Sequence, residues 1–201
     1  RGFLAVTEKV LRRKGKKPGT QEKRGRFNVK KTIKDRPQEV ENRETFGHWE
    51  LDTMVSSRGQ SKGCLATFVE RKTRFYIAIK MDDRSKDSMF LAISSLYNTL
   101  TSKLLKTFTV DRGKEFACFE QVETEFGIPM YFADAYAAWQ RGSNENSNGL
   151  LREFFPKKTD LAKVTLDKLT EALVLINNRP RKCLGFKTPF DMFKHEIKKL
   201  I

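Results

Sequence analysis

Three acidic side chains stand where apolar or neutral residues would be expected. Asp52 lies inside the alternating segment HWELDTMV, Asp111 ends the apolar segment TFTVD, and Glu145 lies in the polar segment WQRGSNENSNG. Three carboxylates at one place repel each other unless cations neutralise them. Carboxylate oxygens are ligands that Mg²⁺ and Mn²⁺ prefer, and two such ions about 4 Å apart promote phosphoryl transfer. The sequence therefore predicts a site in which Asp52, Asp111 and Glu145 hold two Mg²⁺ or Mn²⁺ ions.

Each acid taken alone has a simpler interpretation. An aspartate at the end of a strand, such as Asp111, often only forms a turn, and Glu145 could be the partner of a helix dipole. Asp52 is harder to explain in this way, because it stands in the middle of an expected strand. Taken together with the charge distribution, the three residues favour the metal site.

Basic residues are concentrated at the start of the chain. Residues 1–36 contain 14 lysines and arginines against Glu8, Glu22 and Asp35, whereas the other 165 residues contain 26 basic and 22 acidic residues. A basic arm on a nearly balanced domain indicates a polyanionic partner such as DNA, although a solvated tail is the alternative. The candidate DNA-binding residues of the arm are Arg12, Arg13, Lys14, Lys16 and Lys17.

Composition excludes several other classes of protein. No run of about 18 apolar residues occurs, so a membrane span is not expected. Cys64, Cys118 and Cys183 are an odd number, widely spaced and without a CxxC pair. This pattern argues against a zinc site and against a disulfide scaffold, and it favours reduced thiols in a cytosolic protein.

Apolar periodicity divides the chain into a basic arm, residues 1–45, and a core, residues 46–201. In the core, three strands joined by polar turns precede strands that alternate with helices, which predicts an α/β fold with a mixed five-stranded sheet flanked by helices. The expected strands are His48–Val55, Cys64–Val69, Arg74–Met81, Thr107–Val110 and Met130–Ala133. The expected helices start at Ser85, Glu115, Ser143, Thr165 and Thr188, and the last two follow the sheet as C-terminal helices.

Several residues around the three acids could contact DNA or support the site. Helical spacing places Asn148 and Arg152 on the face of Glu145, where Arg152 could contact phosphate or form an exposed ion pair. Aromatic and amide side chains in the preceding loop could stack on bases, although core packing is an equal alternative for Trp139. The further DNA-binding candidates are Arg141, Lys114, Gln140 and Trp139. His48 and Glu50 are expected to support the site from beside Asp52 rather than to act in the reaction.

Four segments together carry a resemblance to a known family. They read GHWELDT, TVDRGKEFA, YFADAYAAWQRGSNENSNGLLREFFPKKTDL and INNRPRKCLGFKTPFDMF. These segments resemble bacterial insertion-sequence transposases of the IS-thirty family, from roughly Leu11 to the end of the chain. The 33 residues between Asp111 and Glu145 agree with the Asp-Asp-Glu pattern of that family. Leu51 and the segment 135–138 depart from it, without touching the three acids.

The resemblance implies a ribonuclease H-like fold, shared with retroviral integrases, and two Mg²⁺ ions held by Asp52, Asp111 and Glu145. It implies cleavage at the inverted-repeat ends of a transposon, followed by attack of the freed 3′-hydroxyl on target DNA. It also implies a helix-turn-helix region ahead of the core, of which the arm would be a remnant. A dimer on DNA and a place in the bacterial cytoplasm, at the nucleoid, are expected with this activity.

Two other functions are compatible with the same acids. A ribonuclease H-like nuclease that cuts RNA–DNA hybrids would keep similar carboxylates but would lack the WQRGSNENSNG segment. A non-catalytic DNA-binding relic would have lost a carboxylate, whereas all three are present. The sequence therefore favours the transposase.

Overall fold

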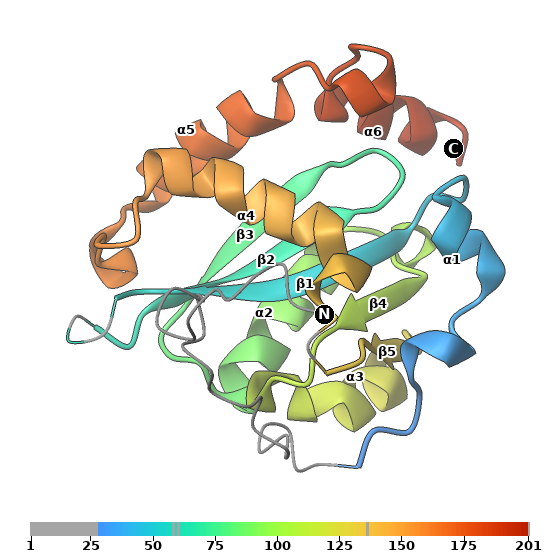
Figure 1. Ribbon diagram of the computed structural model, residues 1–201, viewed down its shortest axis with the longest axis horizontal. Helices are drawn as coiled ribbons and strands as arrows, with labels where there is room; N and C mark the ends of the chain where they lie inside the picture. Colours follow the sequence, from blue (N-terminus) through green and yellow to red (C-terminus); the bar gives the residue numbers. More distant parts are fainter. Residues whose placement is uncertain (1–27, 58, 60, 136, 201) are drawn as a thin grey trace, which may run out of the picture.

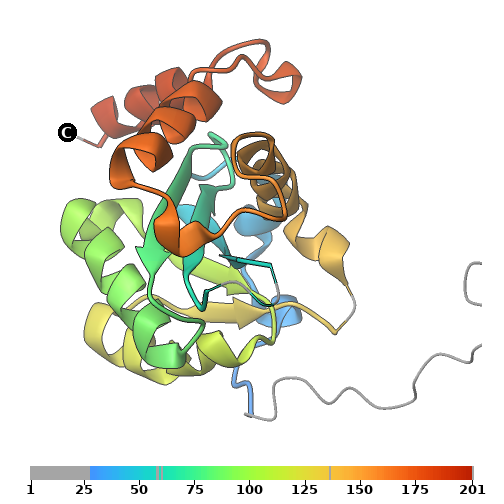
Figure 2. The ribbon, with the colours of Figure 1, turned by 90° about the vertical axis from the view of Figure 1, so that its left-hand side faces the viewer.

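Five strands pair into one mixed sheet in the computed structural model, which describes residues 28–57, 59, 61–135 and 137–200. The sheet has the order β3-β2-β1-β4-β5, and helices cover both of its faces (Figures 1 and 2). The pairs β1–β2 and β2–β3 are antiparallel, whereas β1–β4 and β4–β5 are parallel. The strands are β1 (His48–Val55), β2 (Cys64–Glu70), β3 (Tyr76–Met81), β4 (Thr107–Val110) and β5 (Met130–Phe132).

Alternation along the strands separates two cores. Side chains such as Trp49 and Phe108 point to the face covered by α2 (Lys86–Thr99) and α3 (Phe119–Phe126). Met54 and Leu65 point to the other face, where they meet α4 (Gly142–Phe154) and α5 (Leu166–Asn177). Because successive residues of a strand alternate between faces, Glu50 and Asp52 lie on the face that carries α4.

The parallel pair β1–β4 brings two distant acids together. Its register pairs His48 with Thr107 and Glu50 with Thr109. Two residues further along the same register, Asp52 stands beside Asp111. The carboxyl ends of parallel strands lie at one edge of a sheet, so both carboxylates reach the same place.

The sequence predicts the elements well and their ends less well. The predicted strands of residues 48–55 and 107–110 coincide with β1 and β4. The helix expected from Glu115 to Phe126 instead starts as a 3-10 helix, η3 (Lys114–Cys118), before α3. The buried Glu115 side chain accepts hydrogen bonds from Thr53 and Arg84, and this contact lies in the tightened turn.

The predicted arm and the folded part overlap. Residues 33–42 form the 3-10 helix η1 (Ile33–Asp35) and the short helix α1 (Gln38–Asn42). Val40 is fully buried, and Arg36 donates to the Thr109 hydroxyl at 3.1 Å. This part of the arm therefore packs on the edge of the core. The candidates Arg12, Arg13, Lys14, Lys16 and Lys17 lie outside the described residues.

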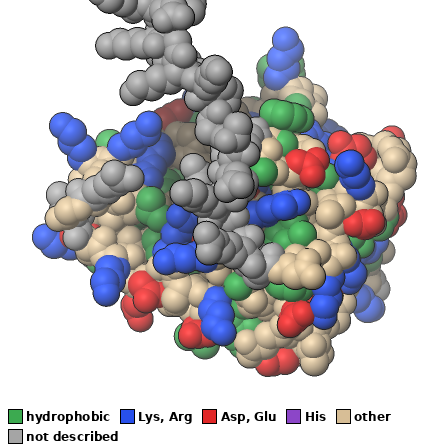
Figure 3. Space-filling model, turned by 60° about the horizontal axis from the view of Figure 1, so that its bottom comes forward, with side chains coloured by type: hydrophobic (Ala, Val, Ile, Leu, Met, Phe, Trp, Pro, Cys, Tyr) green, Lys and Arg blue, Asp and Glu red, His purple; other side chains and the backbone are tan. Residues whose placement is uncertain are grey.

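Charge and cysteine placement agree with the composition. On the face seen in Figure 3, basic and acidic side chains are intermixed. Cys64 and Cys118 are buried and Cys183 is exposed, and all three are free thiols. None of the helices in the described part of the chain has the length and hydropathy needed to cross a membrane.

The last helix, α6 (Pro189–Lys198), packs against the core through one aromatic side chain. Phe193 is buried and stacks on Phe75 at a ring distance of 4.1 Å. It also meets Phe46 and Trp49 edge to face, at 5.4 and 6.1 Å. Burial of this ring therefore connects α6 to strand β1.

Replacement of Phe193 by alanine tests this connection. Because the change leaves a cavity among three aromatic rings, we expect the free energy of unfolding to fall by about 3–4 kcal/mol in urea titration. The matched control is Phe190→Ala on the same helix, where the ring is 41% exposed. A loss for Phe193→Ala no larger than that of the control would show that α6 is not held by this packing.

Candidate active site

An arginine lies between the carboxylate of Asp52, inside β1, and that of Asp111, directly after β4. The Arg141 guanidinium donates to Asp111 at 3.1 Å and lies 3.5 Å from an Asp52 oxygen. Its other contact is the Leu51 carbonyl, at 3.1 Å. Arg141 ends the 3-10 helix η4 (Ala138–Arg141), just before α4 begins. The residues thus form a carboxylate pair, Asp52 and Asp111, bridged by one cation.

Burial and charge act on Asp52 in opposite directions. Burial raises the pKa of its carboxyl above the ordinary value, because it disfavours the charged form. The neighbouring charge of Arg141 and the backbone N–H of Thr53 oppose this rise in the pKa, whereas Asp111 adds to it. Arg141 therefore favours the charged form of the Asp52 carboxyl.

Glu145 lies in the first turn of α4, one turn before a residue that contacts Asp52. Asn148 donates its side-chain amide to Asp52 at 3.1 Å and accepts from the Tyr76 hydroxyl at 2.6 Å. Residues three apart on a helix are neighbours, with about 5–6 Å between their Cβ atoms. The Glu145 side chain is exposed and, among the described residues, makes no hydrogen bond or ion pair. The structure therefore brings Asp52 and Asp111 together but does not join Glu145 to them in one cluster.

Two buried polar residues fix the start of α4 on the sheet. The fully buried Glu50 accepts from the Asn144 backbone N–H at 2.9 Å and forms an ion pair with Arg71. The Asn144 amide donates to the Glu50 carbonyl at 2.9 Å and accepts from Thr67 at 3.2 Å. Glu50 and Asn144 therefore anchor the first turn of α4 to β1 and β2, and the sequence analysis did not identify the anchoring by Asn144.

A second buried carboxylate, Glu115, escaped the sequence analysis. It is fully buried, accepts from Thr53 at 3.0 Å and pairs with Arg84 at 2.5 Å. A Cβ atom at Gly113 would lie 2.5 Å from the Glu115 carboxylate, so a side chain at this position would displace that carboxylate. The signal available in the sequence was the KEF segment directly after the glycine turn.

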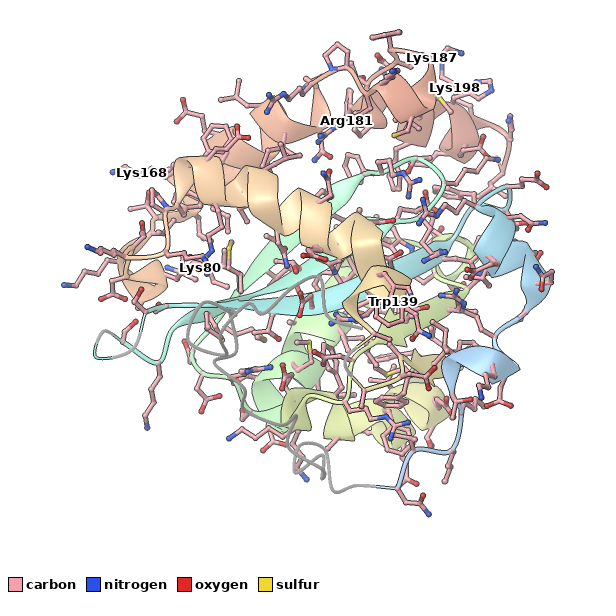
Figure 4. The ribbon with its side chains drawn as sticks, in the orientation of Figure 1. Lys80, Trp139, Lys168, Arg181, Lys187 and Lys198 are labelled. Atoms are coloured by element: carbon pink, nitrogen blue, oxygen red, sulfur yellow. The ribbon has the colours of Figure 1, made fainter. Side chains whose placement is uncertain are left out.

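The remaining candidates differ in what they contact. Trp139 lies in η4 and is 76% exposed, which favours contact with a ligand over core packing (Figure 4). Gln140 closes its own loop by contacts with Asp134, the first at 2.8 Å. Arg152 donates to the Val55 carbonyl at 2.8 Å. Lys114 lines a hollow of about 540 Å³ together with Lys62, Arg84 and Lys86.

The donor set of the pair suits a divalent cation. Carboxylate oxygens of Asp52 and Asp111 converge on a positively charged group, and oxygen donors are the ligands of Mg²⁺ and Mn²⁺. Among the described residues, no three side chains of histidine, cysteine, aspartate or glutamate are close enough to form a metal cluster. The pair is thus formed in the structure, and a part for Glu145 as a third ligand belongs to the proposal below.

Comparison with known proteins shows which proteins this chain is similar to. The pattern of the family described as "Integrase core domain" matches residues 42–138. The transposase InsI for insertion sequence element IS30A of Escherichia coli is 38% identical over 187 residues, which are 92% of this chain and 48% of that protein. Over most of its length, this chain is therefore similar to transposases of the IS30 family. The transposase for element IS4351 of Bacteroides fragilis is 36% identical over 94% of this chain and 58% of its own length. The chain spans about half the length of the curated relatives it matches.

Solved structures with a similar fold identify the fold class of this chain. The catalytic core domain of BIV integrase aligns with a TM-score of 0.60 at 19% identity, over 78% of this chain and all of that one. The catalytic core domain of HTLV-2 integrase, solved in complex with magnesium in a trimeric form, aligns with a TM-score of 0.56 at 18% identity, over 73% and 95% of the two chains. The predicted ribonuclease H-like fold with a mixed five-stranded sheet is thereby confirmed.

The position of Arg141 between two carboxylates leads to a first prediction for the site. In Arg141→Gln the pair loses its cation, and we expect the stability without divalent ions to fall by about 1 kcal/mol, because the groups are partly screened by solvent. Mn²⁺ no longer has to displace a guanidinium, so its affinity should rise roughly tenfold, or about 1.4 kcal/mol. Thermal unfolding and calorimetric titration with Mn²⁺ measure the two effects.

The control for this variant is Arg179→Gln, which breaks an exposed ion pair with Glu153. Unchanged stability together with weaker Mn²⁺ binding in Arg141→Gln would contradict the assigned position of the guanidinium.

His48 predicts a pH dependence of stability. The ring is buried, its Nδ1 lies 2.8 Å from the Thr107 hydroxyl, and burial lowers its pKa from 6.5 to about 4. In the unfolded chain His48 binds a proton below pH 6.5. Its contribution to stability is therefore fully present above pH 6.5 and is lost as the pH falls toward 4, by about 3 kcal/mol in total.

The variant His48→Gln lacks this proton. We expect the difference in unfolding free energy between the wild-type chain and this variant to shrink between pH 6.5 and pH 4, which denaturant titrations at several pH values measure. A difference that stays constant over this range would show that His48 does not enter the fold in its neutral form.

Proposed function

We propose that this chain is the catalytic core of a transposase that cleaves DNA at the inverted-repeat ends of a transposon and joins the freed 3′-hydroxyl to target DNA. The observation that carries the proposal is the carboxylate pair on two adjacent parallel strands, Asp52 inside β1 and Asp111 directly after β4, with Glu145 one turn from the Asp52 partner Asn148. The IS30 transposases share the sequence over most of this chain, which supports the same activity here.

Asp52, Asp111 and Glu145 would hold two Mg²⁺ or Mn²⁺ ions. When bound, such ions activate the attacking oxygen and neutralise the charge that develops on the phosphate. The HTLV-2 integrase neighbour was solved with magnesium, which supports this choice of metal. Among the residues of the chain, Asn148 orients the Asp52 carboxylate, and Arg141 would leave the pair when the ions enter.

Side chains around the pair would bind and align the DNA. Once released, Arg141 would be free to contact the scissile phosphate as a planar, bidentate donor. The exposed Trp139 would stack on a base near the cleaved bond. Lys114 would contact the backbone from its basic hollow. Arg152 donates to the Val55 carbonyl, and Gln140 donates to the Asp134 carboxylate. These two residues would act mainly by shaping the walls of the site.

The partners and the assembly follow from the reaction. Two transposon ends must be processed together, so we propose a dimer or a larger complex on DNA, in the bacterial cytoplasm at the nucleoid. The trimeric form of the HTLV-2 core shows that a chain of this fold can associate. The basic arm, residues 1–45, would add contacts that depend strongly on salt, since phosphate contacts release counterions.

The variant Asp111→Asn tests the reaction. Because it removes one metal ligand and leaves the DNA-facing surface intact, we expect strand transfer to fall by at least about 100-fold while DNA binding is retained. The assay incubates labelled duplexes that carry the ends of the chain's own element with Mg²⁺ or Mn²⁺, and resolves nicked from joined products. Strand transfer at the wild-type rate would refute the assignment of Asp111.

The matched control is Asp167→Asn, an exposed aspartate in the first turn of α5. It makes the same change of charge away from the pair and should leave transfer unaltered. The same assay separates the alternatives: a ribonuclease H-like nuclease would cut RNA–DNA hybrids without joining ends, and a DNA-binding relic would bind without cutting.

A further inference from the structure

Three arginines surround a hollow on the side of α4 that faces the C-terminal helices. The hollow has a volume of about 280 Å³ and is called here the three-arginine pocket; its lining includes Arg43, Arg74, Arg181, Ser143, Asn146 and Ser147. The residues come from the end of α1, the turn before β3, the start of α4 and the α5–α6 connection. Figure 4 shows Arg181 reaching from this connection toward α4.

The positive charge of the pocket is not neutralised within the described part of the chain. No carboxylate lies in its lining, and none of its three arginines forms an ion pair there. Arg74 donates to the Ser143 hydroxyl at 2.8 Å, and the buried Nε of Arg181 has no hydrogen-bond acceptor among the described residues. By contrast, the adjacent Arg71 is paired with Glu50. The pocket therefore has unused donors.

Two of these cations, Arg43 and Arg74, are close enough to repel each other. Burial lowers the pKa of Arg43, and the charges of Arg74 and Arg71 lower it further, whereas Glu50 and Glu41 oppose this change. An anion in the hollow would relieve this repulsion. The start of the 13-residue helix α4 also borders the pocket, and the N-terminal end of a helix attracts negative charge.

The backbone supports this arrangement. Arg43 and Arg74 have positive φ angles of 60° and 63°, a conformation that residues with a Cβ rarely adopt. Only Phe186 shares this property among the non-glycine residues that the structure describes. Such conformations cost of order 1 kcal/mol each and persist where the surroundings demand them. Two of the three residues line the same hollow.

The pocket and the carboxylate pair lie on different sides of one helix. Ser143, Asn146 and Ser147 share one face of α4, whereas Asn148 contacts Asp52 from another face. A helix is about 10 Å wide, and a DNA strand advances about 3.4 Å per nucleotide. The two places are therefore separated by a few nucleotides of one strand.

We infer that the three-arginine pocket binds a backbone phosphate of the DNA strand, a few nucleotides from the bond cleaved at Asp52 and Asp111. The inference rests on the proposed function. Guanidinium groups match phosphate oxygens in a bidentate manner, and a cluster of three with a helix start suits a phosphodiester. The pocket would hold the strand while the scissile phosphate enters the site.

Binding of a random-sequence duplex, followed by fluorescence anisotropy in EDTA over a range of salt concentrations, tests the inference without cleavage. We expect Arg181→Gln to weaken binding about tenfold and to reduce the slope of log K against log[salt] by about 1, the signature of one lost phosphate contact. The control Lys168→Gln removes the same charge at an exposed position on α5 (Figure 4). Its slope should change much less.

A second variant tests whether weaker binding by Arg181→Gln results from misfolding rather than from the lost charge. Asn146→Asp keeps all three arginines and places a carboxylate at an exposed position of the pocket wall, in the first part of α4 where an acid is tolerated. It should weaken binding in the same way. Wild-type affinity and slope in both variants, or an equal loss in Lys168→Gln, would overturn the inference.

Inorganic phosphate distinguishes the source of the anion. If phosphate raises the melting temperature of the wild-type chain but not of Arg181→Gln, while DNA affinity is equal in both, the ligand is free phosphate and the DNA assignment is wrong. The result of the DNA-binding experiment can be told apart from the result of the strand-transfer assay. Arg181-dependent DNA binding without transfer would keep the pocket and sink the proposed reaction, and transfer without that dependence would do the reverse.

Discussion

Mutual repulsion of two carboxylates is the constraint around which this fold is arranged. The parallel register of β1 and β4 forces Asp52 and Asp111 together at one edge of the sheet. Such a pair is stable only when a cation neutralises it, and Arg141 supplies that charge from the segment just before α4. The same geometry that costs energy in the free protein is what makes the edge attractive to divalent ions.

The polar network behind the pair keeps this edge rigid. Glu50 and Glu115 are both fully buried, and each is paired with an arginine, Arg71 or Arg84. Removal of one partner would leave an uncompensated buried charge, which is costly. Glu50 ties the start of α4 to β1, and Glu115 ties the turn after Asp111 to Thr53. Each carboxylate of the pair therefore has its own support.

Features of the structure that follow from local sequence pattern could be predicted, whereas those that depend on long-range contacts could not. The alternation of HWELDTMV and the apolar run TFTV determined β1 and β4, and the resemblance of the motifs gave the fold and the three acids. The bridge by Arg141 and the anchoring by Asn144 depend on residues about 90 positions apart, which no periodicity encodes. The charge and proline content of residues 33–42 favoured an arm, so the sequence did not predict that they pack on the core and bury Val40.

The burial of thiols has a practical consequence. Burial raises the pKa of Cys64 to about 11 and that of Cys118 to about 12, so neither forms a reactive thiolate at neutral pH. Cys183 is exposed and lies at the rim of the three-arginine pocket. A maleimide dye or spin label added to the native protein would therefore attach at a single point, beside the connection between α5 and α6. Cys183 can therefore be labelled to report on that part of the surface without introducing a cysteine by mutation.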